Sequence, residues 1–364
     1  MLEIKPKKKY VIMAGGTGGH VIPGITVAQE LKKQGHEVYW IGTALGIEAK
    51  LVPLQQIIFY AIDIKSLRGK GFIRKCLMPF ALARATWQAR RTLLRLKPDG
   101  VISMGGFVAG PGGLAACLLG IDLYIHEQNA IAGLTNRVLA KLAKKVCVAF
   151  PNTQKIGVSP AKLYQTGNPI RPEIMAIAAP GRRAIGMHSR LRILVLGGSL
   201  GAKAINQVVP KALALLNLAE NKIPEVWHQT GAGRLAEAKQ CYLDSKVKAN
   251  VVDFIQDMAK AYQFADIVIC RAGALTVSEL AAAGIASILI PFPYAVDDHQ
   301  TANAQFLTKT GAAILVDQHS FNPESLVELI LKFIAHPELC LEMAIRARAL
   351  AKTEATAQVV AVCE

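Results

Sequence analysis

Short apolar runs rich in β-branched residues alternate with amphipathic stretches along the whole chain. Such runs are typical of buried parallel strands, and the stretches between them have the spacing of helices. The pattern predicts an α/β fold built on parallel sheets. The expected strands are residues 10–14, 38–41, 101–104, 122–125 and 146–149 in the first half, and 192–196, 225–228, 250–253, 267–270 and 287–290 in the second.

One strand–turn–helix pattern occurs twice, 182 residues apart: Gly15, Gly16, Thr17 and Gly19 align with Gly197, Gly198, Ser199 and Gly201. A glycine-rich turn before a helix presents backbone N–H groups and the helix dipole to an anion. The repeat predicts two Rossmann-like domains facing across a cleft, with a phosphate-bearing ligand in or near it. Taken singly, each turn is equally consistent with an ordinary tight connection.

Two nucleotide-binding classes are disfavoured by the details of these turns. The dinucleotide fingerprint Gly-x-Gly-x-x-Gly is absent, since Val21 follows Gly16-Thr17-Gly18, and no acidic residue closes the strand at 38–41. The Walker pattern is absent as well. These observations argue against a nicotinamide enzyme and a P-loop NTPase.

Length and composition agree with two globular domains. The chain has 364 residues, of which 52% are hydrophobic and 19% charged, so disorder is not expected. Glycine and two prolines at 167–172 mark the join, giving an N-terminal domain over 1–167 and a second domain over 168–347. The uncharged stretches 100–121 and 280–296 contain glycine or proline and are interpreted as buried units, not membrane spans.

The N-terminus and the cysteines predict a cytoplasmic protein. The chain runs from a lysine-rich start directly into the first apolar run, with no signal-peptide pattern. Seven cysteines occur without Cys-x-x-Cys spacing, and Cys76, Cys117, Cys147 and Cys270 lie in apolar surroundings. We expect them to be reduced core thiols.

The charge is concentrated in the first domain. Residues 1–170 contain 23 Lys/Arg and 8 Asp/Glu, whereas 171–364 contain 19 and 18. Residues 64–98 contain ten basic residues and no acidic one, interleaved with apolar side chains. This segment predicts contact with an anionic membrane surface; the alternative is a helix with an inward apolar stripe and solvated charges. The expected contact residues are Phe72, Ile73, Arg74, Lys75, Leu77, Phe80 and Trp87, and no nucleic-acid partner is expected because no binding module is recognisable.

Polar clusters follow several predicted strands, where α/β proteins build their sites. The most specific are His126-Glu127-Gln128-Asn129 and the run from Arg271 to Glu279, within which Thr276 to Glu279 also fits a helix capping box. Together with 14–21, 105–117, 167–172, 197–203, 254–255 and 291–303, these segments resemble the MurG family of glycosyltransferases. The resemblance extends from residue 11 to about residue 313.

The resemblance implies a GT-B fold and inverting transfer of N-acetylglucosamine from UDP-N-acetylglucosamine to lipid I, giving lipid II in peptidoglycan synthesis. It implies a peripheral enzyme on the cytoplasmic face of the cell membrane, without a metal or other cofactor, and allows other cell-wall synthesis proteins as partners. It also implies that a C-terminal helix over 348–364 packs back on the first domain.

Site roles follow from the resemblance residue by residue. The uracil would contact the backbone of Ile255, and the ribose would contact Glu279. Sugar hydroxyls would contact Gln300 and Asn129, with Asn303 nearby. The remaining expected donor-site residues are Thr17, Gly18, Gly19, Arg171, Ser199, Ala274, Leu275, Thr276, Val277 and Ser278, with Gly105 and Gly106 as additional candidates; Thr17 to His20 would also line the acceptor side. His299 precedes Gln300 where some members have glutamine, and its role is open.

The chemistry supports the same assignment. No Asp-x-Asp pair occurs to hold a metal, so helix N-terminal N–H groups with Arg171 are expected to stabilise the leaving diphosphate. An attacking hydroxyl needs a base, and His20, at the end of the first glycine-rich turn, has a suitable side chain. The alternative is that His20 only shapes the loop.

Two other functions remain compatible with the sequence. One is a GT-B enzyme that uses a UDP-sugar and a different acceptor. The other is a noncatalytic membrane-surface protein that binds nucleotide-sugars, which would not release UDP when an acceptor is added.

Overall fold

The computed structural model describes residues 6–64, 72–198, 201–219 and 222–364, and of residues 72–77 it describes only the backbone. The chain divides into two compact units, residues 1–171 with 354–364, and residues 172–353. The domain boundaries expected from the sequence were 167/168 and 347/348, a few residues before the boundaries of these units. Each unit is described by itself below.

The first unit is built on a parallel sheet with the strand order β3-β2-β1-β4-β5-β6-β7. Its strands are β1 Lys9–Met13, β2 Glu37–Gly42, β3 Ile58–Ala61, β4 Gly100–Ser103, β5 Asp122–Glu127, β6 Lys145–Val148 and β7 Leu163–Gln165. Successive side chains of a strand face opposite sides, so Tyr10 and Ile12 pack in one core layer while Val11 and Met13 pack in the other.

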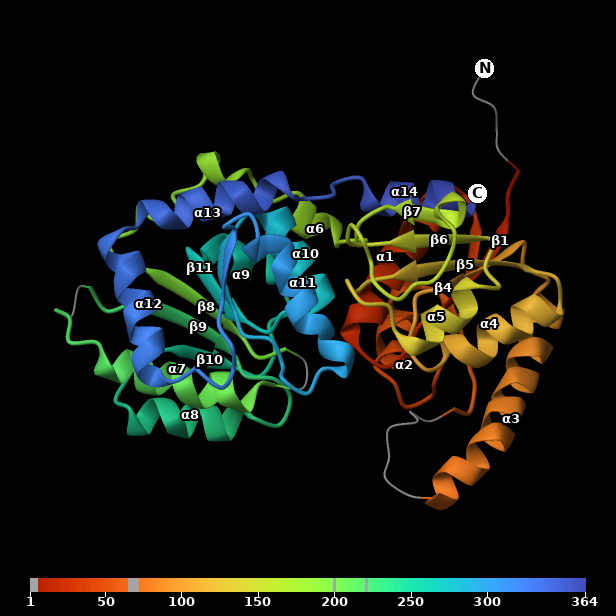
Figure 1. The fold of residues 1–364 in the computed structure, drawn as a ribbon, viewed down its shortest axis with the longest axis horizontal. Coiled ribbons are helices and arrows are strands. Elements are labelled where there is room, and N and C mark those ends of the chain that lie inside the picture. Colours follow the sequence, from red (N-terminus) through yellow and green to blue (C-terminus); the bar gives the residue numbers. More distant parts are fainter. Residues whose placement is uncertain (1–5, 65–71, 199–200, 220–221) are drawn as a thin grey trace. The chain divides into compact units, whose positions relative to one another are not determined.

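Helices cover both faces of this sheet (Figure 1). The layer containing Tyr10 is closed by α1 (Gly18–Lys33) and α14 (Ala355–Cys363). The layer containing Val11 is closed by α3 (Phe72–Leu96), α4 (Ala109–Leu118) and α5 (Leu134–Ala140), whereas α2 (Glu48–Leu51) is a single turn. The expected C-terminal segment 348–364 therefore contains the end of α13 and all of α14.

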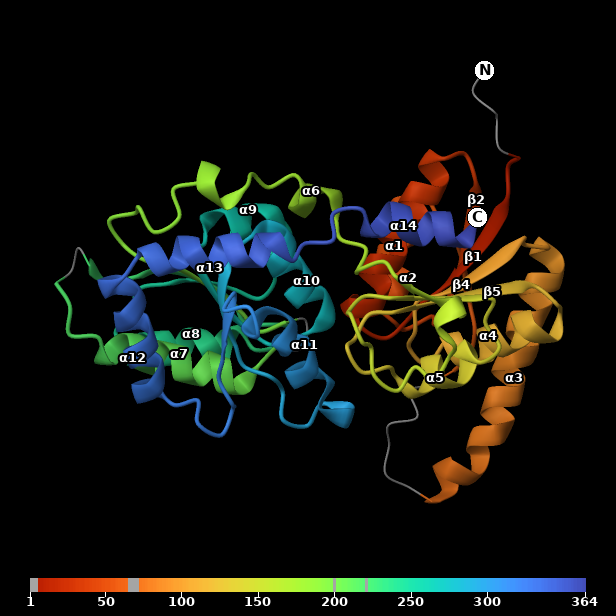
Figure 2. The same ribbon diagram turned by 45° about the horizontal axis from the view of Figure 1, so that its top comes forward.

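The second unit repeats this plan with the strand order β10-β9-β8-β11-β12-β13. Its strands are β8 Arg192–Leu196, β9 Glu225–Gln229, β10 Asn250–Val252, β11 Ile267–Cys270, β12 Ala286–Leu289 and β13 Ala313–Leu315. Its helices are α6 Pro172–Met175, α7 Lys203–Leu215, α8 Leu235–Asp244, α9 Met258–Phe264, α10 Ala274–Ala283, α11 His299–Thr308, α12 Pro323–Ala335 and α13 Glu338–Ala349. Figure 2 shows α7 and α8 on one side of the sheet and α9 and α10 on the other.

The predicted fold class is confirmed, and all ten expected strands are present within one or two residues of their predicted ends. The sequence pattern missed β3, β7 and β13. All three lie at an edge of their sheet, and two of them have only three residues. A short edge strand is covered on fewer sides, so it lacks the continuous apolar run by which the central strands were recognised.

The structure describes the side chains of six cysteines, and all six are free thiols; the side chain of Cys76 lies outside the described ones. Cys147, Cys270, Cys340 and Cys363 are buried, whereas Cys117 and Cys241 are half-buried. Burial raises the pKa of the Cys270 thiol to about 12, so it remains protonated and unreactive near neutral pH.

Candidate functional site

Each sheet reverses its strand order at one point, between β1 and β4 in the first unit and between β8 and β11 in the second. At such a point two neighbouring strands lead into helices on opposite faces of the sheet. The turns that diverge there leave room for a ligand at the carboxyl ends of the strands. The predicted site residues His20, Gly105 and Ala274 all follow β1, β4 or β11 closely.

The first glycine-rich turn is occupied by a carboxylate of the protein itself. Glu48, on α2, is fully buried, and its Oε2 accepts a hydrogen bond from the N–H of Gly16 at 3.3 Å. Its Oε1 accepts from the N–H and the hydroxyl of Thr43 at 3.0 and 2.7 Å. The N–H of Gly16, which has a positive φ of 98°, is therefore already paired with a negative charge.

The repeat led us to expect two equivalent turns, but the two turns differ in the structure. Helix α1 begins at Gly18, whereas α7 begins at Lys203, three residues later than the offset of 182 predicts. Gly198 and Gly201 have positive φ values of 75° and 74°. Ser199 lies outside the described residues, so its expected role as a donor ligand is not addressed by the structure.

His20 lies in the first turn of α1 and is half-buried. Its Nδ1 is 3.0 Å from the carbonyl oxygen of Met104 and 3.0 Å from Oε1 of Gln128. The N-cap residue of this helix, Thr17, is exposed and makes no side-chain capping bond, and Gly18 and Gly19 are half-exposed. The structure thus places the predicted base on a helix N-terminus, with one ring nitrogen held by protein groups.

A second turn packs against His20. Gly105 and Gly106, after β4, have positive φ values of 91° and 83°. A Cβ atom added to Gly105 would lie 3.1 Å from Nδ1 of His20, and one added to Gly106 would lie 2.2 Å from the carbonyl oxygen of Gly15. Only glycine allows this approach, so the turn after β4 fixes both the first glycine-rich turn and the imidazole.

The segment after β5 is organised by Glu127, which is 1% exposed. Its Oε1 accepts from the backbone N–H and the side-chain amide of Asn129 at 2.9 and 3.2 Å. Its Oε2 accepts from the N–H of Gly133 at 3.0 Å and from Nδ2 of Asn136 at 2.8 Å. Glu127 therefore shapes the loop that carries Asn129, a role that sequence reasoning did not assign.

In the second unit, α10 begins at Ala274, where the sequence analysis expects a phosphate-binding helix end. Its N-cap is Gly273, without a side-chain capping bond and without an acidic residue in the first turn. The possible capping box of Thr276 with Glu279 is wrong, because both residues lie within the helix instead of bracketing its start. Glu279 is 3% exposed, and its Oε2 accepts a hydrogen bond from the hydroxyl of Tyr262 at 3.1 Å.

Ala274, Leu275 and Val277 of this helix are buried, and Thr276 and Ser278 are half-buried. The helix start is tied to α11, since Nδ2 of the buried Asn303 donates to the carbonyl oxygen of Ala272 at 3.2 Å. Asn303 therefore holds the turn before α10.

Two further donor-site candidates have partners of their own. The N–H of Ile255 donates to Oε1 of Gln229 at 2.9 Å, and no partner of the Ile255 carbonyl lies within the described part of the chain. Oε1 of Gln300 accepts from the N–H of Phe292 at 2.8 Å. Nδ1 of the adjacent His299 is 2.8 Å from the carbonyl oxygen of Val296. Gln300 and His299 therefore contact the two ends of the loop 292–296.

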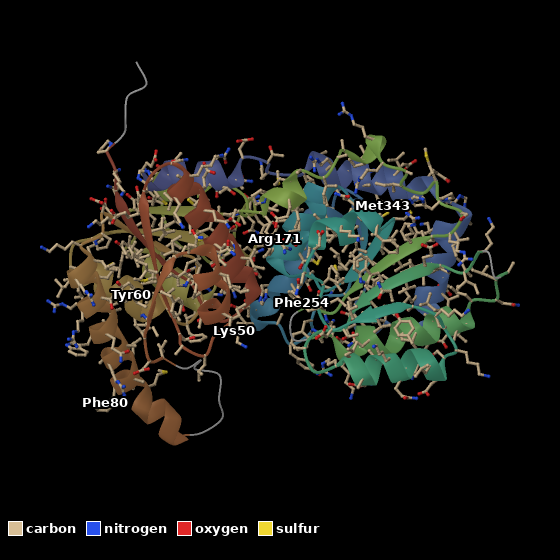
Figure 3. The ribbon with its side chains drawn as sticks, turned by 180° about the vertical axis from the view of Figure 1, so that it is seen from behind. Lys50, Tyr60, Phe80, Arg171, Phe254 and Met343 are labelled. Atoms are coloured by element: carbon tan, nitrogen blue, oxygen red, sulfur yellow. The ribbon has the colours of Figure 1, made fainter. Side chains whose placement is uncertain are left out.

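Arg171 and Arg271 differ in their surroundings. Arg171 is the last residue of the first unit before the chain enters the second, and it is labelled in Figure 3. Arg271 is fixed within the second unit: its guanidinium donates to the carbonyls of Ile290 and Pro291 at 3.1 Å and lies over the ring of Phe292. Arg271 therefore supports the loop of Phe292, which Gln300 also holds.

Helix α3 has two distinct faces. Ala85, Ala89 and Leu93 are buried in the core of the first unit. Phe80 and Trp87 are 75% and 59% exposed and lie on the opposite side of the helix by their spacing. Arg84, Arg91 and Arg95 share this outer face; Arg84 pairs with Asp63 at 2.7 Å, and Arg91 lies 5.9 Å from the ring of Trp87.

Figure 3 shows Phe80 on the part of α3 that extends past the strands of its own unit. The inward stripe that we considered as an alternative therefore coexists with an outer apolar and basic face. The side chains of Phe72, Ile73, Arg74, Lys75 and Leu77 lie outside the described ones.

Neither a metal-binding cluster nor a membrane-spanning helix occurs among the described residues. No group of three or more His, Cys, Asp or Glu side chains there has the arrangement of a metal site. No helix in those same segments has the length and hydropathy needed to span a membrane.

Comparison with known proteins identifies the family. The glycosyltransferase family 28 N-terminal domain matches residues 10–148, and the C-terminal domain of that family matches residues 192–359. A relative from Cupriavidus necator is 50% identical over 98% of this chain and 97% of its own length. The crystal structure of MurG from Acinetobacter baumannii is 44% identical, with a TM-score of 0.81 over 98% of this chain and 99% of that one. The chain belongs to the MurG family, within glycosyltransferase family 28.

Another family member, from Dechloromonas aromatica, is 47% identical over 98% of both chains. It and the Cupriavidus relative are named UDP-N-acetylglucosamine--N-acetylmuramyl-(pentapeptide) pyrophosphoryl-undecaprenol N-acetylglucosamine transferase. The family match confirms the resemblance that the motifs indicated, and with it the GT-B class of the two parallel-sheet units.

The contacts of Glu48 predict the effect of removing its charge. In Glu48→Gln an amide NH₂ replaces one acceptor oxygen and faces a buried N–H or hydroxyl donor, which should cost about 1–3 kcal/mol of stability in the first unit. The two units need not unfold together, so hydrogen exchange of peptides from each unit in increasing urea is the suitable measurement. Glu37→Gln, at a surface pair with Lys7, is the matched control and should leave the urea midpoint nearly unchanged. Equal midpoints for both variants would contradict the role of Glu48.

Proposed function

We propose that this protein transfers N-acetylglucosamine from UDP-N-acetylglucosamine to the 4-hydroxyl of the N-acetylmuramoyl-pentapeptide of lipid I, with inversion, to give lipid II. The observation that carries this proposal is the near full-length identity of 47–50% to transferases named for that reaction. UDP-N-acetylglucosamine and lipid I are then the substrates. The site geometry supports a division of the work between the two units.

The second unit holds the donor in this proposal. The N-terminus of α10 presents backbone N–H groups and a partial positive charge to the diphosphate, assisted by Arg171 and by Ser199. The buried carboxylate of Glu279, oriented by Tyr262, accepts hydrogen bonds from the ribose diol. The carbonyl oxygen of Ile255 accepts from the uracil N–H. The backbone N–H of Ile255 already donates to Gln229, so the carbonyl is the backbone group left for the uracil.

Gln300 and Asn129 complete the proposed donor site at the sugar. The side-chain oxygen of Gln300 already accepts from Phe292, and its NH₂ has no partner within the described residues. Gln300 can therefore donate to a sugar hydroxyl without releasing its loop. Asn129 is presented by the loop that Glu127 organises.

The first unit supplies the base in this proposal. Inversion requires the acceptor hydroxyl to attack from the side opposite the leaving diphosphate, so the base belongs to the acceptor side. His20 has one ring nitrogen engaged by Met104 and Gln128 and is half-buried, so the ring is held but accessible. It accepts the hydroxyl proton as the new glycosidic bond forms and the bond to UDP breaks.

Turnover tests the reaction and the base together. Incubation with UDP-N-acetylglucosamine and a lipid I analogue should give a product heavier by one N-acetylglucosamine, with UDP released only when the acceptor is present. His20→Ala should lower turnover by about 10²–10⁴-fold, leave UDP affinity nearly unchanged and remove the loss of rate towards acid pH. UDP release without acceptor, or product with a different acceptor only, would reject the reaction. A loss below tenfold with the acid limb intact would mean that His20 only shapes its loop.

Nucleotide binding tests Glu279 separately. Glu279→Gln removes a charge-assisted hydrogen bond to the ribose, which should weaken UDP binding by about 1.5–3 kcal/mol, or about 10- to 150-fold. Calorimetric titration with UDP measures the change. Glu324→Gln, at an exposed position on α12, is a control expected to bind UDP normally. Unaltered UDP affinity in a folded Glu279→Gln protein would remove this residue from the site.

We further propose that the outer face of α3 binds an anionic membrane surface, which is where a lipid-linked acceptor is found. Phe80 and Trp87 are exposed on a helical stripe shared with arginines, so apolar groups can enter the headgroup region while the guanidinium groups pair with phosphates. In the sequence, the basic segment 64–77 precedes these residues.

Replacing Phe80 and Trp87 together by Ser should weaken binding to phosphatidylglycerol vesicles at least about tenfold, because each buried aromatic side chain contributes more than 1 kcal/mol. Added salt should weaken wild-type binding as well. Vesicle sedimentation measures both effects, and turnover on a short-chain soluble acceptor should be retained. Leu243→Ser, at an exposed apolar residue of α8, is the control. Vesicle binding that survives the double replacement would place the membrane contact elsewhere.

A further inference from the structure

The imidazole of His20 is held in one protonation pattern by its neighbours. Its Nδ1 faces the carbonyl oxygen of Met104 and Oε1 of Gln128, each at 3.0 Å. A carbonyl oxygen can only accept, so Nδ1 must carry the hydrogen. In the neutral ring the lone pair is then on Nε2, for which no partner occurs among the described residues.

The orientation of Gln128 decides whether its oxygen or its NH₂ faces His20, and His126 sets that orientation. His126 is fully buried, and its Nε2 is 2.9 Å from the carbonyl oxygen of Gly167, so Nε2 is the donor. Burial lowers the pKa of His126 to about 4, which keeps the ring neutral and leaves Nδ1 as an acceptor. The NH₂ of Gln128 donates to that nitrogen at 3.1 Å, which turns its oxygen towards His20.

We infer that Gln128 and His126 are positioning residues that hold His20 as the Nδ1–H tautomer and so present Nε2 as the basic nitrogen. The chain of contacts runs from the Gly167 carbonyl through His126, Gln128 and His20 to the Met104 carbonyl, so both of its ends are backbone carbonyls. A histidine side chain in water favours the opposite tautomer, with the hydrogen on Nε2. That form would point a hydrogen at the acceptor hydroxyl and could not take its proton.

This inference rests on the proposed role of His20 as base and makes that role more specific. During transfer, Nε2 forms a bond to the hydroxyl proton while the hydrogen on Nδ1 stays in place. The resulting imidazolium donates through Nδ1 to Met104 and Gln128, both of which remain acceptors, so its charge is stabilised without rearrangement. No proton passes along the chain of contacts, and neither positioning residue changes its protonation.

The tautomer can be measured without any substrate. Long-range ¹H–¹⁵N NMR of protein labelled with ¹⁵N-histidine, at a pH where His20 is neutral, distinguishes a protonated from an unprotonated ring nitrogen. The wild-type protein should show His20 with hydrogen on Nδ1. Gln128→Leu should produce a measurable Nε2–H population. Gln128→Glu should restore Nδ1–H in its protonated form, because the carbonyl oxygen of the carboxyl group then accepts from His20 while its O–H donates to Nδ1 of His126.

A matched control lies in the second unit. His228 is also buried and neutral, with Nδ1 2.9 Å from the hydroxyl of Tyr242 and Nε2 3.1 Å from Oδ1 of Asn206. Burial lowers the pKa of His228 to about 3. Tyr242→Phe removes one partner of a buried histidine outside the site, and it should leave the His20 tautomer unchanged.

Turnover then separates the inference from the proposal on which it rests. Gln128→Leu should lower kcat at least about tenfold with UDP affinity unchanged, as is typical when a group orienting an active-site imidazole is lost, and Gln128→Glu should recover part of it. An Nε2–H form in the wild-type protein, or pure Nδ1–H in Gln128→Leu, would overturn the positioning role. A shifted tautomer with unchanged turnover would uphold the positioning and reject His20 as the base.

Discussion

The reversal of strand order in each parallel sheet is the constraint on which the site depends. Between β1 and β4 the chain departs to opposite faces, towards α1 and towards α4, so the two turns open away from each other at the carboxyl edge. The glycines after β4 can approach the turn after β1 only because neither turn carries a Cβ atom there. The same reversal between β8 and β11 brings the turn before α7 and the start of α10 to one edge of the second sheet.

Similar turns in the two units have acquired different chemistry. In the first, the side-chain carboxyl group of Glu48 accepts a hydrogen bond from the N–H of Gly16 and occupies that place in the turn. The start of α1 carries His20, which we propose as the base. In the second unit α10 starts without an acidic residue or a side-chain cap, which suits a diphosphate. A repeated sequence pattern therefore does not imply a repeated ligand.

The sequence predicted features that depend on local pattern and missed those that depend on distant contacts. Central strands were found because burial on both faces leaves a continuous apolar run, whereas β3, β7 and β13 at the edges were not. His20 was selected from its place beside the glycines. Glu48 was not selected, and Gln128 was noted only as a member of the cluster 126–129, because nothing near them in sequence shows that one pairs with Gly16 and the other with His20. Tyr262, which orients Glu279, was missed for the same reason.

The contacts that fix His20 all belong to the first unit. Met104 follows β4, Gln128 follows β5 and Gly167 follows β7, so the order of these strands in one sheet brings their carboxyl ends towards α1. Each contact is made by buried groups, since Met104, His126 and Gln128 are at most 1% exposed. The protonation pattern of the imidazole is therefore set by the fold of a single unit and needs no contribution from the donor. In the proposed reaction, a base prepared in this way meets the acceptor hydroxyl already oriented, and the cost of ordering it belongs to folding and not to the reaction.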